Sequence, residues 1–432
     1  MTKTILKDGL LIDPVSGKER VVSLTIEGEC ISAITEQSTP ASNTNDVVLD
    51  LNGQWIIPGI VDLSCALQEP GYEQNETIAT GLAAAAKGGI TAVCASPETL
   101  PIVDNAAVVV QVQEKARTAT GARLIPIGAA TQGLKGDALA SYGELKEHGC
   151  PAVTQGTGSI QSANMMRRAL EYAKAFDIVV IHQALEHSMK GLCDEGPWST
   201  RLGLPASPAQ AELIAIERDV ALAELTDSRL HLTRVSTALG VDAIRRAKAK
   251  GIKVTCDTTI NHLHLTTAAL SGYDSNYKVW PPLRSESDVQ AVREGLADGT
   301  IDVITSDHRP VHLQDKALEF MQAQFGISGF ESLLGLTLDL IESGALTRMQ
   351  AIGALTAGPR RVLGQEANVL APGQTADLTI IDPKASWILD EASMISKGTN
   401  TPFLGKVFMG RASRTIVAGQ TVFSATSEKI TI

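Results

Sequence analysis

The run Trp55-Ile56-Ile57-Pro58-Gly59-Ile60-Val61 is followed directly by Asp62-Leu63-Ser64-Cys65-Ala66-Leu67-Gln68-Glu69-Pro70-Gly71. The first run is apolar and rich in β-branched residues, so it predicts a buried strand. Polar residues and a Pro-Gly pair follow it, which is typical of the end of a strand. This stretch therefore predicts a buried strand with candidate functional side chains just after it.

The middle of the chain repeats this unit, with strands and helices in alternation. Its strand candidates are residues 56–63, 90–96, 122–128, 151–155, 178–183, 229–236, 252–257 and 301–306. The stretches between them are amphipathic or Ala-rich, for example 78–87, 164–175, 209–225 and 241–250. This alternation predicts an α/β fold with a parallel (β/α)8 TIM barrel over residues 58–364. In such barrels the chemistry sits at the carboxyl ends of the strands.

The two ends of the chain resemble each other and differ from the middle. Residues 1–57 hold short alternating strands, with a hairpin turn expected at Gly28-Glu29. Residues 365–432 show the same pattern of short strands followed by turn residues. We therefore expect both ends to build one small β-sandwich domain, into which the barrel is inserted.

Composition excludes several classes of protein. The 432 residues are 44% hydrophobic and 20% charged, as in a folded globular protein. A net charge of −11 argues against a nucleic-acid surface, and no apolar run is long enough for a membrane span. The first residues have no signal-peptide core, which predicts a cytoplasmic protein. The six cysteines form no Cys-x-x-Cys pair and are expected to be small buried hydrophobes.

Several motifs, in order along the chain, resemble those of dihydroorotases and their amidohydrolase relatives. The family's first metal-binding strand has the pattern Asp-x-His-x-His-x-Arg-Glu-Pro-Gly, which residues 62–71 follow only in part. The other motifs are Ser96-Pro97-Glu98-Thr99-Leu100-Pro101, His182, residues 230–237, residues 278–284 and residues 305–310, with Ala371-Pro372-Gly373 near the end. The resemblance implies the barrel and the sandwich, and a metal site in the barrel mouth.

The metal ligands that this resemblance implies are mostly absent. Ser64 and Ala66 replace the two histidines of strand one, and neither side chain can substitute for imidazole. Strand four offers Gly156 and Thr157 where the family has a bridging acid or modified lysine, and Arg234 replaces the histidine of strand six. Of the implied ligands, His182 and Asp307 are present, whereas a catalytic zinc normally has three protein ligands.

Arg234 suggests what replaces the ion. A guanidinium carries a permanent positive charge and cannot bind a cation, but it can pair with a carboxylate. We expect Arg234 to pair with Asp307 in the barrel mouth, in preference to pointing into solvent at the rim. A remodelled metal site built from His182, Asp307 and His262 is the alternative.

The substrate-binding positions implied by the resemblance are changed as well. Gln68 replaces the arginine, while Glu98 and Trp280 replace asparagines. We expect Gln68 to keep a hydrogen bond without the charge, and Trp280 to fill space. Glu98 places a negative charge where an anionic substrate is expected, which predicts repulsion.

These substitutions favour a protein without catalytic activity. The resemblance is closest to the inactive dihydroorotase-like chains that accompany aspartate carbamoyltransferase in pyrimidine biosynthesis. It implies a pseudoenzyme without a cofactor, in homo- and hetero-oligomers with the aspartate carbamoyltransferase catalytic chain and with no nucleic-acid or membrane partner. The alternative is an active zinc-dependent cyclic amidohydrolase, of the dihydroorotase or of the allantoinase/hydantoinase kind. A small-molecule binding module is a third hypothesis.

Overall fold

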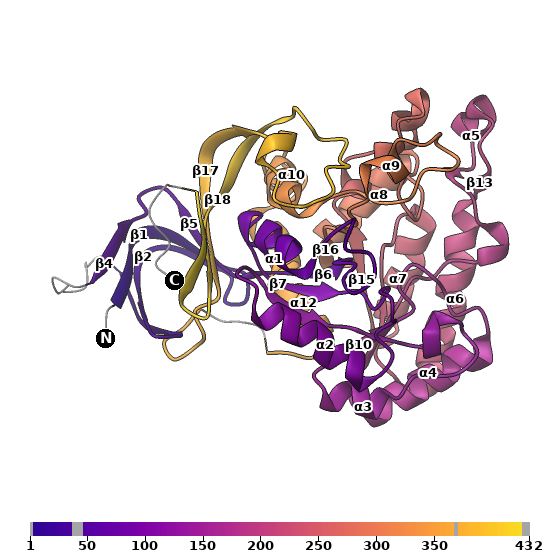
Figure 1. Cartoon of the computed structure of the whole chain (residues 1–432), viewed down its shortest axis with the longest axis horizontal. Helices are drawn as coiled ribbons and strands as arrows, with labels where there is room; N and C mark the ends of the chain where they lie inside the picture. The colour runs from indigo at the N-terminus through magenta and orange to yellow at the C-terminus, as the bar shows by residue number, and fades with distance from the viewer. Residues whose placement is uncertain (1–2, 37–45, 367–369, 426–432) are drawn as a thin grey trace.

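The structure is a computed structural model, and it describes residues 3–36, 46–366 and 370–425. A mainly β part and a larger α/β part lie side by side, and the strands near both chain ends belong to the β part (Figure 1). Within the described residues the fold is the predicted α/β one, a TIM barrel with a small β domain from both chain ends.

The β part is formed by a sheet that joins the beginning of the chain to its end. Its strand order among the described residues is β19-β18-β17-β5-β1-β2-β3, and β4 pairs with β1. Apolar side chains from both ends pack into one core, for example Leu24, Ile56 and Leu378. The strands are β1 (Lys3–Asp13), β2 (Lys18–Glu27), β3 (Cys30–Thr35), β4 (Val47–Asp50), β5 (Trp55–Pro58), β17 (Leu378–Ile388), β18 (Val407–Val417) and β19 (Gln420–Ser424).

The hairpin predicted at Gly28-Glu29 is confirmed, because β2 and β3 pair in antiparallel fashion on either side of it. Gly28 has a φ of 59°, a conformation that glycine adopts without steric cost. The predicted first barrel strand over 56–63 is only partly right. Residues up to Pro58 pair with β1 and β17 in the end sheet, and the barrel strand begins at Ile60.

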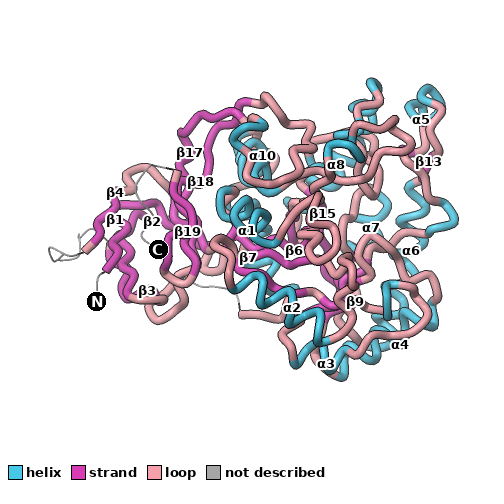
Figure 2. Tube along the Cα trace, in the orientation of Figure 1, coloured by secondary structure: helices cyan, strands magenta, loops and turns pink. Residues whose placement is uncertain are grey.

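Parallel strands form the wall of the barrel, shown in magenta beneath the helices in Figure 2. They are β6 (Ile60–Cys65), β7 (Ile90–Ala95), β8 (Arg123–Pro126) with its continuation β9 (Gly128–Ala129), β10 (Ala152–Thr154), β11 (Val179–His182), β14 (Leu230–Leu232), β15 (Val254–Thr259) and β16 (Val303–Thr305). The last strand returns to the first, because a parallel bridge joins Cys65 to His308 and Ala66 N donates to His308 O at 2.8 Å.

Helices cover the outside of the barrel strands (Figure 1). Several of them begin at a side chain that accepts a backbone N–H of the first turn, namely at Thr77, Asn105, Ser162, Thr237 and Ser285. The main helices are α1 (Ile78–Lys87), α2 (Ala106–Arg117), α3 (Tyr142–Glu147), α4 (Ala163–Ala175), α6 (Ala209–Thr226), α7 (Ala238–Ala249), α8 (Glu286–Ala297), α10 (Phe330–Glu342), α11 (Arg348–Leu355) and α12 (Ala357–Val362).

Small elements complete the side of the barrel where the strands end. They are the 3₁₀ turns η2 (His187–Met189) and η3 (Asn261–Leu263), the strand pair β12 (Cys193–Asp194) and β13 (Ala206–Ser207), and the helices α5 (Pro197–Leu202) and α9 (Leu313–Lys316). In a TIM barrel, this side carries the functional loops.

The cysteines match the prediction with one exception. All are free thiols, and those within the barrel part are buried, but Cys30 at the start of β3 is exposed. Cys30 directly follows the exposed turn at Gly28-Glu29, and its neighbour Ile31 is the residue of this strand that packs into the core. Within the described ranges, no helix has the length and apolar character needed to cross a membrane.

Candidate active site at the barrel mouth

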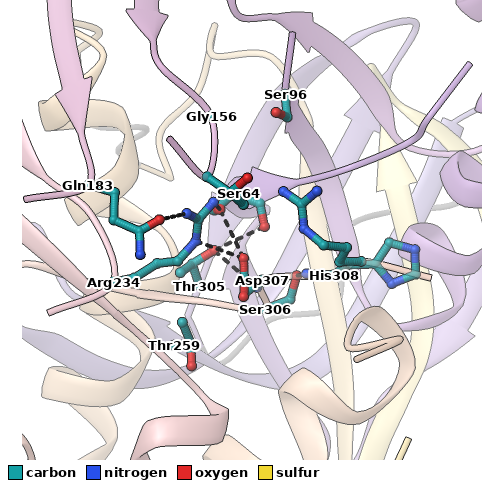
Figure 3. A network of polar contacts seen from close by, with 12 residues as sticks. Ser64, Ser96, Gly156, Gln183, Arg234, Thr259, Thr305, Ser306, Asp307 and His308 are labelled. Carbon is teal, nitrogen blue, oxygen red and sulfur yellow. Dashed lines mark hydrogen bonds and ion pairs between the residues drawn. The ribbon is translucent and has the colours of Figure 1, made fainter. Parts of the chain in front are cut away.

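Arg234 lies at the centre of the barrel mouth, and the predicted pairing with Asp307 is confirmed. Its Nε donates to Oδ1 of Asp307 at 2.8 Å, while the side chains are 5% and 10% exposed. Its Nη1 donates to Oε1 of Gln183 at 2.6 Å and its Nη2 to Oγ of Ser64 at 3.1 Å. Figure 3 shows Arg234 reaching between Gln183, Ser64 and Asp307. The guanidinium is thus held by one side chain after β11, one after β16 and one near the end of β6.

Both partners of this ion pair have an uncommon backbone conformation. Arg234 has a φ of 58° and Asp307 a φ of 47°, in the left-handed region that non-glycine residues rarely adopt. Such strain persists only where the surrounding structure holds it, and it is concentrated at functional sites. Here Arg234 N donates to Oδ1 of Asp257 at 2.8 Å, which fixes the turn after β14.

Asp307 keeps one carboxylate oxygen free of the protein. Its Oδ1 accepts from Arg234 and, at 3.5 Å, from Oγ of Ser64, but within the described residues Oδ2 accepts no hydrogen bond. Burial raises the pKa of Asp307, and the Arg234 guanidinium opposes that shift. A carboxylate with a raised pKa and a free oxygen is suited to accept and return a proton.

His182 is present at the end of β11, but its ring nitrogens are already engaged. Its Nε2 accepts the backbone N–H of Ile160 at 2.7 Å, so the proton of the ring lies on Nδ1. Nδ1 is 2.7 Å from Oδ2 of Asp219 and donates to it. The lone pair that a metal would use is therefore occupied by a backbone donor.

His262 is buried and engaged in the same way. Its Nδ1 lies 2.8 Å from Oγ1 of Thr259 and its Nε2 3.2 Å from the carbonyl oxygen of Pro281. Burial, together with the Arg284 guanidinium, lowers the pKa of His262 to about 4. The residues of the alternative metal site, His182, Asp307 and His262, do not converge: among the described residues, no group of three or more His, Cys, Asp and Glu side chains lies close enough to hold an ion.

Gly156, at the position of the family's bridging group, has no room for a side chain. Its φ is 67°, and a Cβ built on it would lie 2.5 Å from Cδ of Glu98. The Glu98 carboxylate therefore occupies the space beside strand four. Oε1 of Glu98 also accepts the backbone N–H of Thr157 at 3.0 Å.

The expected repulsion by Glu98 is not what the structure shows, because the charge of Glu98 is compensated. Nη2 of Arg309 donates to its Oε2 at 2.7 Å, and Oγ of Ser96 donates to the same oxygen at 2.9 Å. Burial alone would raise the pKa of Glu98, but Arg309 and the Thr157 donors outweigh it and lower the pKa to about 2. Glu98 is thus an ionised and fully paired carboxylate.

Both ends of the Gln68 amide are hydrogen-bonded within the protein. Its Nε2 donates to the carbonyl oxygen of Pro310 at 2.5 Å, and its Oε1 accepts from Nδ2 of Asn75 at 2.7 Å. The expected hydrogen bond is present, but it ties the loop after β6 to the loop after β16. Ala66 is buried beside it and carries no polar side-chain atom.

A cavity of about 270 Å³ opens beside this network and has two cations in its wall. Trp280, which is buried as expected, packs edge to face on Phe325 at 5.7 Å between ring centroids. The residues of the wall include Gln68, Thr157, Lys190, Trp280, Arg309 and Phe325. A second cavity, of about 20 Å³, lies deeper and borders Ser64, Gly156 and Arg234.

Two buried lysines hold the loop that brings Gln324 and Phe325 to this cavity. Nζ of Lys278 donates to the carbonyl oxygens of Phe320 and Ala323, each at 2.6 Å. Nζ of Lys316 donates to those of Gln324 and Gly326, each at 2.9 Å. These hydrogen bonds stabilise the loop. Burying the two ammonium groups is nevertheless unfavourable, because carbonyl groups solvate an ammonium less well than water does.

We expect this cost to appear as a pH dependence of stability. Burial and the nearby Lys278 ammonium lower the pKa of Lys316 to about 7, against 10.5 for a free lysine. Between those values the unfolded chain binds the extra proton, so stability rises with pH, by at most about 1.4 kcal/mol per unit for one proton. Lys316→Met removes this increment.

The measurement is urea unfolding at several pH values from 6 to 10. Lys250→Met, at an exposed lysine at the end of α7, is the matched control and keeps the slope of the parent protein. Equal slopes for the parent and for Lys316→Met would show that Lys316 does not titrate in this range.

Comparisons with known proteins agree with this architecture. The family model described as "Dihydro-orotase-like" matches residues 53–239. A protein of Anaeromyxobacter dehalogenans (strain 2CP-C) named "Dihydroorotase" is 46% identical over 421 residues, which cover 96% of this chain and 97% of that protein. The chain belongs to the dihydroorotase-like family.

Further relatives extend the same result. A "Dihydroorotase" of Geobacter metallireducens is 43% identical over 97% of this chain and 99% of its own length. Among solved structures, the L-hydantoinase (dihydropyrimidinase) of Arthrobacter aurescens has a TM-score of 0.87 at 20% identity, covering 100% of this chain and 98% of its own. At that identity the likeness supports the fold alone.

The prediction of a non-catalytic pseudoenzyme subunit is wrong on this finding. Family members that are similar over nearly their whole length carry the name of an enzyme, and none of these names denotes a chain that accompanies aspartate carbamoyltransferase. The predictions that the chain is no enzyme and has no cofactor depended on that interpretation and are wrong with it. Association with aspartate carbamoyltransferase, and the oligomeric state, stay predictions.

Several site residues were missed at the level of sequence. Lys190 stands in a loop with no motif around it, and Asp219 lies within α6, 37 positions from the His182 that it contacts. Arg309, which pairs with Glu98, lies within the motif at residues 305–310 but was not predicted to act in the site. The Asp-His-Arg run after strand eight was the available signal, since a charged residue at a barrel strand end is a functional candidate.

Proposed function

We propose that this protein hydrolyses a cyclic amide of the dihydroorotate kind in the mouth of its barrel. The observation that carries the proposal is the 46% identity, over 96% of the chain, to a protein named dihydroorotase. The cavity of about 270 Å³ in the barrel mouth, whose wall includes Arg309 and Trp280, is of the size that a single small ring requires.

Hydrolysis requires a new bond between a water oxygen and the ring carbonyl carbon, followed by cleavage of the ring C–N bond. Asp307 supplies the proton transfer, because its Oδ2 is free to take the proton of the water and return it to the leaving nitrogen. Arg234 fixes the carboxylate through Oδ1 and presents a positive charge beside the developing oxyanion.

Zinc is the cofactor that the family resemblance implies for activating the water. The donors at the matching positions do not fit a zinc site of that kind. Nε2 of His182 accepts the Ile160 N–H, Arg234 is cationic, and Gly156 has no side chain. The activity is therefore to be measured both with and without added zinc.

The test is hydrolysis of dihydroorotate, dihydrouracil and hydantoin by the full-length protein, with and without added zinc. Ring opening above the protein-free rate supports the proposal, and its absence for every ring under both conditions contradicts it. The cytoplasmic location expected from the sequence is in keeping with this activity and stays a prediction.

A further inference from the structure

The wall of the cavity of about 270 Å³ holds two cations, and among the described residues Lys190 is the one without an ion-pair partner. Arg309, the other cation in the wall, is ion-paired to Glu98 at 2.7 Å. Lys190 lies just after η2, and within the described part of the chain no carboxylate lies within ion-pair distance of its Nζ. The neighbouring acid, Glu186, accepts hydrogen bonds from the N–H and the hydroxyl of Ser188, at 3.0 and 2.8 Å.

The Lys190 ammonium is held over an aromatic surface. Its Nζ lies 4.7 Å from the centroid of the Trp280 ring, and Trp280 packs against Phe325. A cation over an indole is attracted to the ring face but keeps its hydrogen-bonding capacity for a ligand. The flat aromatic surface of Trp280 and the positive charge of Lys190 therefore face the same cavity.

Buried polar atoms without partners also border this part of the site. The indole N–H of Trp280, at the cavity of about 270 Å³, is 5% exposed and has no hydrogen-bond acceptor in the described residues. The hydroxyl of Thr233, which borders the cavity of about 20 Å³, has no partner among these residues either. Burying a polar group without a hydrogen-bond partner is unfavourable. A polar ligand or ordered water would relieve this cost.

Other groups that bind an anion in the family are not available here. Gln68 has replaced the arginine of strand one and is hydrogen-bonded to Pro310 and Asn75. Glu98 is an anion that uses the charge of Arg309. Lys190 is therefore the cation in this wall that has no carboxylate partner among the described residues.

We propose that Lys190 is a specificity-determining residue that receives the carboxylate of a cyclic-amide substrate, whose ring lies against Trp280 and Phe325. This inference rests on the proposed function for the identity of the ring. It assigns the anion contact to the loop after β11, in place of the strand-one residue. An anionic ring is then preferred over a neutral ring of the same shape.

The experiment measures binding by calorimetry, and turnover separately, for dihydroorotate and for dihydrouracil, which lacks the carboxylate. We expect the full-length protein to bind the anionic ring at least about tenfold more tightly, and Lys190→Met to abolish that preference without weakening the neutral ring. Lys190→Arg retains the preference, and Lys250→Met, at an exposed lysine remote from the cavity, leaves it unchanged.

The outcomes separate this inference from the proposed function. Charge-dependent binding without ring opening supports the role of Lys190 and contradicts the hydrolase. Turnover of both rings with equal affinity, or an equal loss for both in Lys190→Met, overturns the role of Lys190 while the hydrolase stands. If neither ring binds, both proposals fall.

Discussion

Replacing Arg234 with leucine is expected to lower the free energy of unfolding by about 3–5 kcal/mol, because it leaves the Asp307 carboxylate buried without a partner. The guanidinium also donates to Gln183 and Ser64, so these groups lose their donors as well. Urea unfolding of the parent and of Arg234→Leu measures the difference.

Two further variants identify the cause. Arg234→Leu combined with Asp307→Leu removes both charges and is expected to recover most of the loss, since a buried ion pair is often replaceable by apolar groups. Arg245→Leu breaks surface ion pairs with Asp242 and Asp298 and is expected to cost less than about 1 kcal/mol. A loss for Arg234→Leu as small as that for Arg245→Leu would show that the central pair carries little stability.

Asp307→Asn is expected to lower kcat for ring opening by about 10²–10⁴-fold, because the amide cannot take the proton from water. The side chain keeps its shape and can still accept from Arg234 through its oxygen, so the loss is assigned to proton transfer. The measurement is kcat and KM at several pH values, with far-ultraviolet circular dichroism to verify the fold.

Asp302→Asn is the matched control for this change. Asp302 lies at the other end of β16, where it pairs with Lys248 at 2.6 Å and accepts the backbone N–H of Cys256. Chemistry in a TIM barrel takes place at the opposite ends of the strands, so we expect kcat of Asp302→Asn to stay within about twofold of the parent. Equal losses in both variants would assign the effect of Asp307→Asn to stability.

The barrel and the central ion pair were predictable from sequence because each depends on a regular pattern. Alternating strands and helices place Arg234 after β14 and Asp307 after β16, at the same end of the parallel barrel, so their opposite charges meet across the mouth. The boundary of the first strand was less predictable. Pro58 and Gly59 allow the chain to leave the end sheet and start the barrel, which an apolar run alone does not reveal.

The state of individual polar atoms was beyond prediction. The lone pair of His182 is taken by a backbone N–H at residue 160, and the charge of Glu98 is balanced by Arg309, 211 positions away. Such contacts depend on loop geometry and have no spacing signature. The prediction of inactivity was wrong because it relied on a few missing metal ligands. The similarity to proteins named dihydroorotase extends over nearly the whole chain.

The reaction of dihydroorotate with the purified full-length protein tests most directly whether this chain opens a cyclic amide. Ring opening is followed by the loss of amide absorbance in the far ultraviolet, with and without added zinc. We expect turnover that is saturable and is lost in Asp307→Asn. A rate equal to that of buffer in both conditions, from protein shown to be folded, would contradict this expectation.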